Sequence, residues 1–326
     1  MHIRFITSTP LNFFQGSGTF AGIAALRAAL ESRGEIVELL APDFPFPNYT
    51  LQRLIFNRRI AHRPLPPCDF TIGFDMDGYR LAGRTPGIYV ASSKGVIADE
   101  MRFERGLTRL TMGIQAAREK QNLLRADFAI TTSRYSAAKI QELYSLPRAP
   151  DIVPELISLA AWTSLLHRQE AASDPSRFKI LTVGRFYQRK RFDVLLRAVA
   201  RLRDAIPGLE LRIVGGGPEA ARLKSISREC GIETIVHWRE NIPRDGLARE
   251  YAGCDVFCLP SVQEGFGIVF LEALAAGKPI VAVRAAAVPE VVRDGLLVPP
   301  DDPESLAAAI EKLYRDPSLR AALAES

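Results

Sequence analysis

The sequence is poor in the residues that build metal sites and disulfide frameworks. It has four cysteines and four histidines, with no C-x-x-C pair and no close grouping of histidines. Zinc ligands occur at short, regular spacings, so neither residue type indicates a zinc site. We expect small buried thiols in a reducing compartment. The cysteines are Cys68, Cys230, Cys254 and Cys258.

Long apolar runs are also missing. A membrane-spanning helix needs about 20 apolar residues, but the most apolar stretch, 268–288, is interrupted by Glu272, Lys278 and Arg284. The N-terminal apolar stretch is too short for the core of a signal peptide. These absences predict a cytoplasmic protein.

The motifs of two large enzyme classes are absent. No G-x-S-x-G occurs, which disfavours a serine hydrolase, and no G-x-x-x-x-G-K-[ST] occurs, which disfavours a P-loop enzyme. The net charge of +5 over 326 residues is mild. It suits an anionic small molecule or surface, and we expect no nucleic-acid partner.

The chain does contain a repeated α/β rhythm. Short apolar runs read as buried strands and alternate with segments of helical periodicity, which favours parallel sheets. The longest helical stretch of the first half is 98–124. The predicted strands are 3–7, 36–40, 70–74, 87–90, 128–131, 178–183, 209–214, 234–238, 255–259 and 279–283.

The polar, proline-bearing segment 169–177 separates two such α/β regions and reads as a linker. We predict an N-terminal Rossmann-like, acceptor-side domain over 1–168 and a C-terminal donor-binding domain over 178–326. Ligands of such sheets bind beyond the carboxyl ends of the strands. The predicted fold class is therefore α/β, with two Rossmann-like domains facing across a cleft.

The strongest motif runs from Glu264 to Glu272, after a strand and into a helix. Gly265 and Gly267 allow the backbone to approach a ligand closely. The first amides of a helix suit a phosphate. By the usual helical pitch, Glu272 is expected about two turns into the helix. One carboxylate could meet sugar hydroxyls while the other reaches a ribose.

A second motif, residues 182–191, begins at the carboxyl end of the first strand of the second domain. Arg185 and Lys190 lie in the turn that leads to the next helix, where cations can neutralise a diphosphate. An ordinary solvated basic loop is the alternative. Together, the two motifs point to one anionic ligand.

With these motifs, the second half resembles the family four retaining glycosyltransferases (glycosyl transferases group 1), which have the GT-B architecture. The resemblance also rests on 213–218, 276–281, 289–292 and 296–300. It implies that Arg185, Lys190 and Glu264 are catalytic and that Glu272 binds the ribose. The implied donor-binding residues are Gly16, Gly18, Gly184, Gly215, Gly265, Phe266, Gly267, Ile268, Val269 and Glu272.

The resemblance further implies an activity. A hexosyltransferase of this kind moves a sugar from a nucleotide-diphosphate-sugar to a sugar, lipid-linked or small-molecule acceptor, with retention of anomeric configuration. It needs no metal and no cofactor, because the protein supplies the cations. The alternatives are a nucleotide-sugar epimerase or hydrolase of similar fold, and a non-catalytic nucleotide-binding relative.

Weaker signals lie in the first half. Asp75 and Asp77 form a D-x-D that could be a turn, an acceptor-facing pair or, as in the GT-A architecture, a metal site. Many relatives carry a histidine after the strand at 87–90. This chain has none there, and Lys94 is the candidate for that neighbourhood.

Residues Leu51 to Arg63 interleave apolar side chains with arginines. Such a basic amphipathic helix can lie on an anionic membrane. It can equally be an ordinary surface helix with a solvated cationic face. A peripheral membrane contact therefore stays open at this point.

Overall fold

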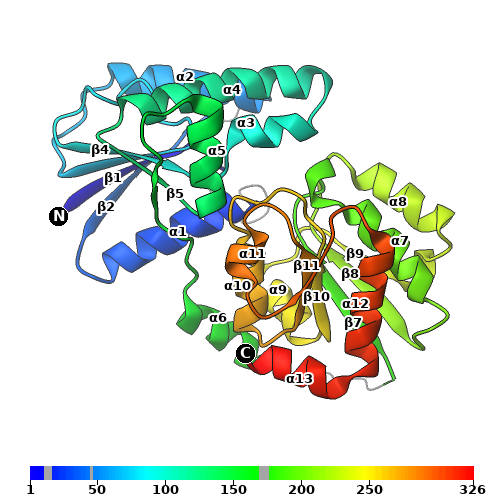
Figure 1. The fold of residues 1–326 in the computed structure, drawn as a ribbon. Coiled ribbons are helices and arrows are strands. Elements are labelled where there is room, and N and C mark those ends of the chain that lie inside the picture. Colours follow the sequence, from blue (N-terminus) through cyan, green and yellow to red (C-terminus); the bar gives the residue numbers. More distant parts are fainter. Residues whose placement is uncertain (11–16, 45–46, 169–175) are drawn as a thin grey trace. The chain divides into compact units, whose positions relative to one another are not determined.

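The computed structural model describes residues 1–10, 17–44, 47–168 and 176–326. The chain divides into two compact units, with the main boundary between Leu156 and Ile157 (Figure 1). Each unit is built on a six-stranded sheet in which every pairing is parallel. Both halves are therefore Rossmann-like, as predicted.

The sheet of the first unit has the strand order β2-β1-β3-β4-β5-β6. Chain order reverses between β1 and β3, since β2 lies on one side of β1 and the later strands on the other. The elements of this unit are β1 (His2–Ile6), α1 (Ser17–Glu31), β2 (Ile36–Leu40), α2 (Tyr49–His62), β3 (Phe70–Phe74), β4 (Ile88–Ser93), α3 (Ile97–Glu100), α4 (Gly106–Arg125), β5 (Phe128–Thr131), α5 (Arg134–Tyr144) and β6 (Asp151–Ile152).

The sheet of the second unit has the order β12-β11-β10-β7-β8-β9, so its reversal lies between β7 and β10. The elements are α6 (Leu159–His167), β7 (Phe178–Val183), α7 (Phe192–Leu202), β8 (Leu209–Val214), α8 (Ala220–Glu229), β9 (Val236–Arg239), α9 (Arg244–Ala252), β10 (Val256–Leu259), α10 (Ile268–Ala275), β11 (Ile280–Val283), α11 (Val288–Val291), β12 (Leu296–Val298), α12 (Pro303–Arg315) and α13 (Pro317–Glu325).

The predicted strands match the observed ones within a few residues at either end. The match has a physical reason: strands of a parallel sheet are covered on both faces and read as continuous apolar runs. All six residues of β7 and all four of β10 are buried. The strands β6 and β12, of two and three residues, were not predicted.

The prediction of one long helix over 98–124 is wrong. The structure has the short α3, a 3-10 turn over Met101–Phe103, and then α4, which begins at Gly106. Gly106 has a φ of 54°, in the left-handed region that favours glycine. The apolar periodicity continues across this break, so periodicity alone does not reveal it.

Packing divides the chain earlier than the sequence predicted. Helix α6 precedes the expected linker but packs on α9 and α10 of the second unit. Its Trp162 is 1% exposed and belongs to the core of that unit. The first unit therefore ends at Leu156 rather than at residue 168. Of the predicted linker, residues 169–175 lie outside the described part of the chain.

Two features noted in the sequence bear on chemistry. Cys254 and Cys258 are buried, whereas Cys68 and Cys230 are only partly so. Within the described ranges, no helix combines the length and the apolar character that crossing a membrane requires.

We expect Trp162→Ala to destabilise the second unit by about 3–5 kcal/mol, because it removes a fully buried aromatic side chain. Leu159→Ala, at a side chain of α6 that is 60% exposed, should change the free energy of unfolding by at most about 0.5 kcal/mol. Urea unfolding of the two variants measures the difference. Equal stabilities would contradict the placement of α6 in the second unit.

Candidate functional site

The loops that follow β7 and β10 leave the sheet of the second unit at its point of reversal. In open α/β sheets this is where ligands bind, beyond the carboxyl ends of the strands. The first loop carries Arg185 and Lys190, and the second carries Glu264 to Gly267. The topology therefore brings the two strongest sequence motifs to one place.

The two loops are joined by hydrogen bonds. The amide of Val262 donates to the carbonyl of Arg189 at 2.9 Å. The Ser261 hydroxyl donates to the same carbonyl at 3.3 Å. The Arg189 Nε donates to the Gln263 Oε1 at 3.0 Å. These contacts fix the position of Lys190 and of Glu264, which directly follow them in the chain.

Lys190 and Glu264 form an ion pair across the joined loops. The Lys190 Nζ lies 2.5 Å from the Glu264 Oε1, and the side chains are 14% and 8% exposed. Arg185 lies on the same loop as Lys190 and is half-buried. The predicted catalytic residues Lys190 and Glu264 thus meet, in a place that little water reaches.

Glycines let the neighbouring loops approach closely. A Cβ at Gly215 would overlap the carbonyl oxygen of Gly184, and a Cβ at Gly217 would lie under 3 Å from the backbone of Phe186. The amide of Phe186 donates to the carbonyl of Gly216 at 2.9 Å. Gly184 and Gly215 therefore shape the loop that carries Arg185.

Helix α10 begins directly beyond the ion pair. Gly267 occupies its N-cap position with a φ of 91° and offers no side-chain acceptor. The first amides of a helix have no partner within it and carry a partial positive charge, which suits a phosphate. Ile268 and Val269 provide such amides. Gly265 and Phe266 are half-buried in the preceding turn.

Glu272 is the fifth residue of α10, so it lies just over one turn into the helix rather than about two. The Tyr251 hydroxyl donates to its Oε2 at 3.1 Å. Burial raises the pKa of Glu272 to about 7, although the Tyr251 hydrogen bond and the Arg244 charge oppose the rise. The Trp162 Nε1 donates to the Glu272 carbonyl at 3.0 Å. Sequence reasoning missed Tyr251 and Trp162, because no motif links them to Glu272.

In the first unit, the structure separates the roles of the two aspartates. Asp77 is fully buried and accepts hydrogen bonds from the Ser8 amide and hydroxyl, Arg53 and Asn57, at 2.6–3.2 Å. Its carboxylate is saturated by protein donors, so Asp77 holds the fold and does not face an acceptor. This corrects the acceptor-side prediction for Asp77.

Asp75 lies at the carboxyl end of β3, with a φ of 53° that is strained for a residue other than glycine. Its Oδ1 accepts from the Lys94 amide at 2.8 Å. Burial raises the pKa of Asp75 to about 6, against the opposing charge of Arg53. Asp75 and the backbone of Lys94 therefore lie together at neighbouring strand ends.

The Lys94 side chain is not directed to Asp75. Its Nζ lies 3.1 Å from the Glu155 Oε2, and both side chains are 7% exposed. Among the residues that the structure describes, no group of three or more histidine, cysteine, aspartate or glutamate side chains could hold a metal ion.

The N-terminal glycine loop is only partly described. Gly16 lies outside the described residues, whereas Gly18 is exposed in the first turn of α1. A Cβ at Gly18 would meet nothing within 4 Å. Packing therefore does not require a glycine at position 18.

Comparison with known proteins agrees with this geometry. Residues 165–326 match the family described as Glycosyl transferases group 1. The second half of the chain thus matches a glycosyltransferase family. The matched residues include both joined loops and all of α10. The glycosyltransferase family assignment thus rests on the unit that holds the Lys190–Glu264 pair.

Individual relatives extend the match. The GDP-mannose-dependent alpha-(1-6)-phosphatidylinositol monomannoside mannosyltransferase of Mycolicibacterium smegmatis is 29% identical over 247 residues, which are 72% of this chain and 64% of that protein. The D-inositol 3-phosphate glycosyltransferase of Corynebacterium jeikeium is 40% identical over 162 residues, 46% of this chain and 39% of that protein. The chain thus spans under two thirds of the length of either relative.

Among solved structures, sucrose-phosphate synthase from Thermosynechococcus elongatus superposes with a TM-score of 0.81 and 22% identity. The match covers 100% of this chain and 92% of that one. It supports the predicted fold class, the GT-B architecture with two Rossmann-like units.

The raised pKa of Glu272 predicts a pH-dependent stability. The folded protein binds this proton more tightly than the unfolded chain, whose reference pKa is 4.5, so stability falls as pH rises from about 4.5 to about 7. Glu272→Gln cannot titrate. We expect its stability relative to the parent protein to be greater at pH 8 than at pH 4.5, by about 2–3 kcal/mol.

Urea unfolding at the two pH values measures this difference. Tyr251→Phe serves as the companion variant: it keeps the ring but removes the hydrogen bond that favours the carboxylate, so its stability should fall more steeply with pH than that of the parent. A difference between Glu272→Gln and the parent that does not change with pH would contradict the buried carboxyl.

Proposed function

We propose that the protein transfers a sugar from a nucleotide-diphosphate-sugar to an acceptor hydroxyl, with retention of anomeric configuration. The observation that carries the proposal is the Lys190–Glu264 pair at the strand reversal of the second unit, next to the first turn of α10. A cation, a carboxylate and helix amides are the groups that a sugar diphosphate requires.

In the proposed reaction, the bond between sugar and diphosphate breaks through an oxocarbenium-like state. Negative charge then develops on the departing diphosphate. Arg185, Lys190 and the amides of Ile268 and Val269 stabilise that charge in a preorganised, poorly hydrated site. The leaving phosphate takes the proton of the acceptor hydroxyl. The protein supplies the cations itself, so the proposed reaction needs no metal and no cofactor.

The ion pair must open for this to happen. Lys190 exchanges Glu264 for the diphosphate, and Glu264 is then available to accept hydrogen bonds from the donor sugar. Glu272 takes the ribose hydroxyls, and the Tyr251 hydroxyl keeps its carboxyl oriented. Gly184, Gly215, Gly265, Phe266 and Gly267 give the donor the close backbone approach that it needs. Gly16 and Gly18 are proposed as further donor contacts.

The names of the relatives suggest the substrate classes. One relative uses GDP-mannose, and both act on inositol compounds that carry phosphate. A phosphate-bearing polyol, free or lipid-linked, is accordingly the proposed acceptor. In the first unit, Lys94 supplies a cation for such a phosphate, and Asp75 accepts a hydrogen bond from an acceptor hydroxyl.

We expect Arg185→Ala and Lys190→Gln each to lower kcat/KM for sugar transfer by about 10²–10³-fold, because each removes one cation from the developing charge. The glutamine amide can still donate to Glu264, so the buried carboxylate keeps a partner and folding is retained. Lys312→Gln, at an exposed position of α12, should leave turnover unchanged.

The assay follows products of several nucleotide sugars, with and without acceptor, beside thermal stabilisation by the nucleoside diphosphate. Unchanged turnover in the Arg185 and Lys190 variants would contradict their role. Altered sugar nucleotide without any acceptor would indicate an epimerase or hydrolase instead. Nucleotide binding with no turnover for any donor would indicate a non-catalytic relative.

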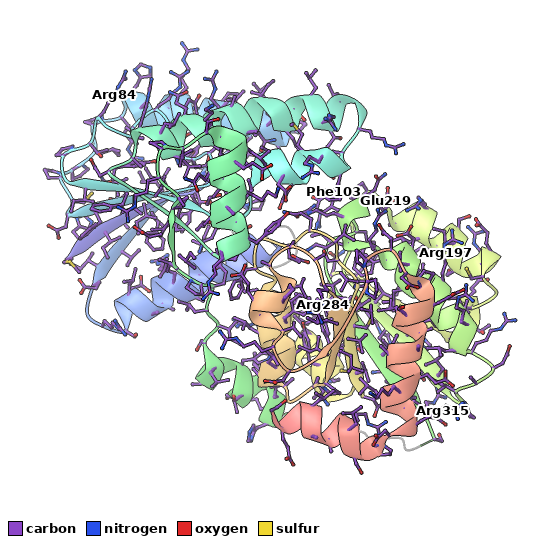
Figure 2. The ribbon with its side chains drawn as sticks, in the orientation of Figure 1. Arg84, Phe103, Arg197, Glu219, Arg284 and Arg315 are labelled. Carbon is purple, nitrogen blue, oxygen red and sulfur yellow. The ribbon has the colours of Figure 1, made fainter. Side chains whose placement is uncertain are left out.

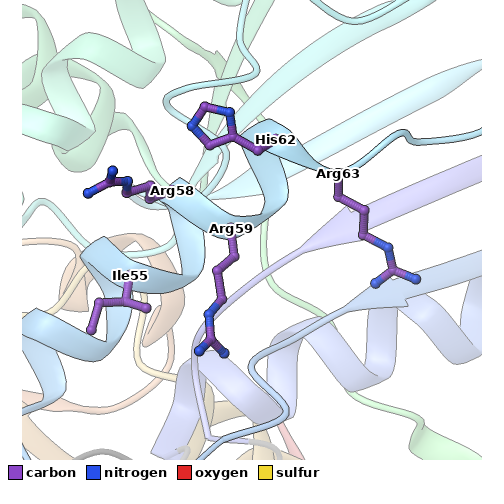
Figure 3. Close-up of a pocket in the computed structure, with 5 residues that line it drawn as sticks. All are labelled: Ile55, Arg58, Arg59, His62 and Arg63. Atoms are coloured by element: carbon purple, nitrogen blue, oxygen red, sulfur yellow. The ribbon is translucent and has the colours of Figure 1, made fainter.

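The proposal also includes a peripheral membrane contact through α2. Leu51, Ile55, Arg58, Arg59 and His62 recur at helical spacing, so they share one face. Figure 3 shows the last four, with Arg63, around a hollow on this helix. Arg53, on the opposite side, is buried and paired with Asp77. The exposed face is therefore cationic, with apolar side chains toward its N-terminal end.

We expect full-length protein to bind vesicles that contain phosphatidylglycerol, and less so as salt rises. The double charge reversal Arg58→Glu/Arg59→Glu should weaken sedimentation with these vesicles at least tenfold, since each basic side chain contributes about 1 kcal/mol near an anionic surface. Arg33→Glu, a single charge reversal at an exposed position after α1, is the control outside α2. Equal binding by all three proteins would make α2 an ordinary solvated helix.

A further inference from the structure

A second basic hollow lies in the first unit, and none of the residues predicted to bind donor or acceptor lines it. Its volume is about 170 Å³. One wall comes from the connection between β3 and β4, and the other from one face of the last turns of α4. The lining residues are Tyr79, Arg80, Arg84, Arg118, Gln121 and Arg125.

The hollow is distinct from the edge that carries Asp75 and Lys94. Asn122, on the buried face of α4, donates to the carbonyl of Asp75 at 2.9 Å. The lining residues of α4 recur at spacings of three and four and occupy a different face. Arg84 projects at the margin of the unit (Figure 2).

Four guanidinium groups meet here without a counter-charge. Among the described residues, no carboxylate lies within 4.0 Å of any of the four arginines, whereas Arg222 elsewhere pairs with both Asp193 and Glu219. Arginine is permanently charged in proteins. Like charges held together cost free energy unless an anion offsets them, so this arrangement calls for a ligand.

The hollow is also preorganised. Tyr79 is 2% exposed, and two guanidinium groups lie over its ring, with the Arg80 Cζ at 5.4 Å and the Arg118 Cζ at 5.3 Å from the centroid. The Arg80 Nε donates to the Tyr79 hydroxyl at 3.0 Å. The Arg118 Nη1 donates to the Gln121 Oε1 at 3.1 Å. Stacking and hydrogen bonds thus hold both cations in place.

One hydrogen-bond donor of this cluster has no acceptor among the described residues. The Arg118 Nε is buried and has no hydrogen-bond partner among the described residues. A buried unpaired donor costs about 1–3 kcal/mol, and native proteins contain few. An acceptor oxygen brought by a ligand would remove that cost.

We propose that this hollow binds a phosphate or pyrophosphate group of a small ligand, independently of the donor site. Arginine forks match phosphate oxygens bidentately. The volume is below the roughly 300–1,000 Å³ of sites that enclose drug-sized ligands, which excludes a whole nucleotide sugar. The site therefore recognises the anionic group itself.

The test uses calorimetric titration of the full chain with inorganic pyrophosphate. The parent for the test is Arg185→Ala/Lys190→Gln, which removes the proposed donor cations. We expect this parent to bind one pyrophosphate, and the added change Arg80→Gln/Arg118→Gln to weaken binding tenfold or more. Arg109→Gln, at an exposed position of α4 outside the hollow, removes one positive charge from the same helix and should change nothing.

Because Arg80 and Arg118 pack on a buried ring, their replacement could disturb folding, so a second variant tests the hollow without this effect. Arg84→Gln/Arg125→Gln changes only exposed residues of the rim and should also weaken binding. Absence of binding in the parent, or equal loss in Arg109→Gln, would overturn the proposal. Binding to phosphatidylglycerol vesicles through Arg84 and Arg125, without pyrophosphate binding, would assign the cluster to a lipid surface and overturn it as well.

Discussion

The ion pair between Lys190 and Glu264 is the constraint on which the proposed donor site depends. Both groups are almost enclosed, and removing one partner of such a pair leaves an uncompensated buried charge, which is strongly unfavourable. A ligand that opens the pair must therefore offer an anion to Lys190 and hydrogen-bond donors to Glu264 at once. Phosphate alone satisfies the first requirement and a free sugar only the second. A sugar joined to a diphosphate satisfies both, so in the proposed reaction the pair selects for the intact donor before any chemistry occurs.

The fold was largely predictable because the central strands of its second sheet, such as β7, β10 and β11, are buried at every residue. A run such as Phe178–Val183 does not fit a surface helix, which would show polar interruptions at its own period, and its six residues are the length of a strand rather than of a buried helix. The failures have a different origin. Gly106 breaks the helical stretch through a backbone angle that the apolar pattern does not record. Helix α6 belongs to the second unit because Trp162 packs on Tyr251, 89 residues away, in edge-to-face geometry at 5.5 Å. Contacts between such distant residues are invisible to local periodicity.

The candidate site was predictable to the same extent. Arg185, Lys190 and Glu264 follow strand ends, and the topology of a parallel sheet gathers strand ends at one edge. Tyr251 could not be predicted, because it reaches Glu272 from α9 and leaves no motif. The D-x-D shows the limit most clearly. Asp75 and Asp77 are two residues apart and chemically identical. Asp75 accepts one hydrogen bond from the Lys94 amide. Asp77 accepts hydrogen bonds from Ser8, Arg53 and Asn57, which occupy its carboxylate fully. The two aspartates differ only in the hydrogen-bond donors that surround them.

The two units use the same topological position in opposite ways. At the reversal between β1 and β3, Ser8 and Asp77 join the loops through hydrogen bonds that are wholly buried. At the reversal between β7 and β10, the loops are joined by an ion pair whose side chains are still partly exposed. A saturated carboxylate has no capacity for a ligand, whereas an exchangeable pair does. In the first unit, the residues proposed to contact the acceptor therefore lie at the ends of β3 and β4, where the Lys94 amide donates to Asp75. The proposed division of roles between the units follows from how each reversal is bonded.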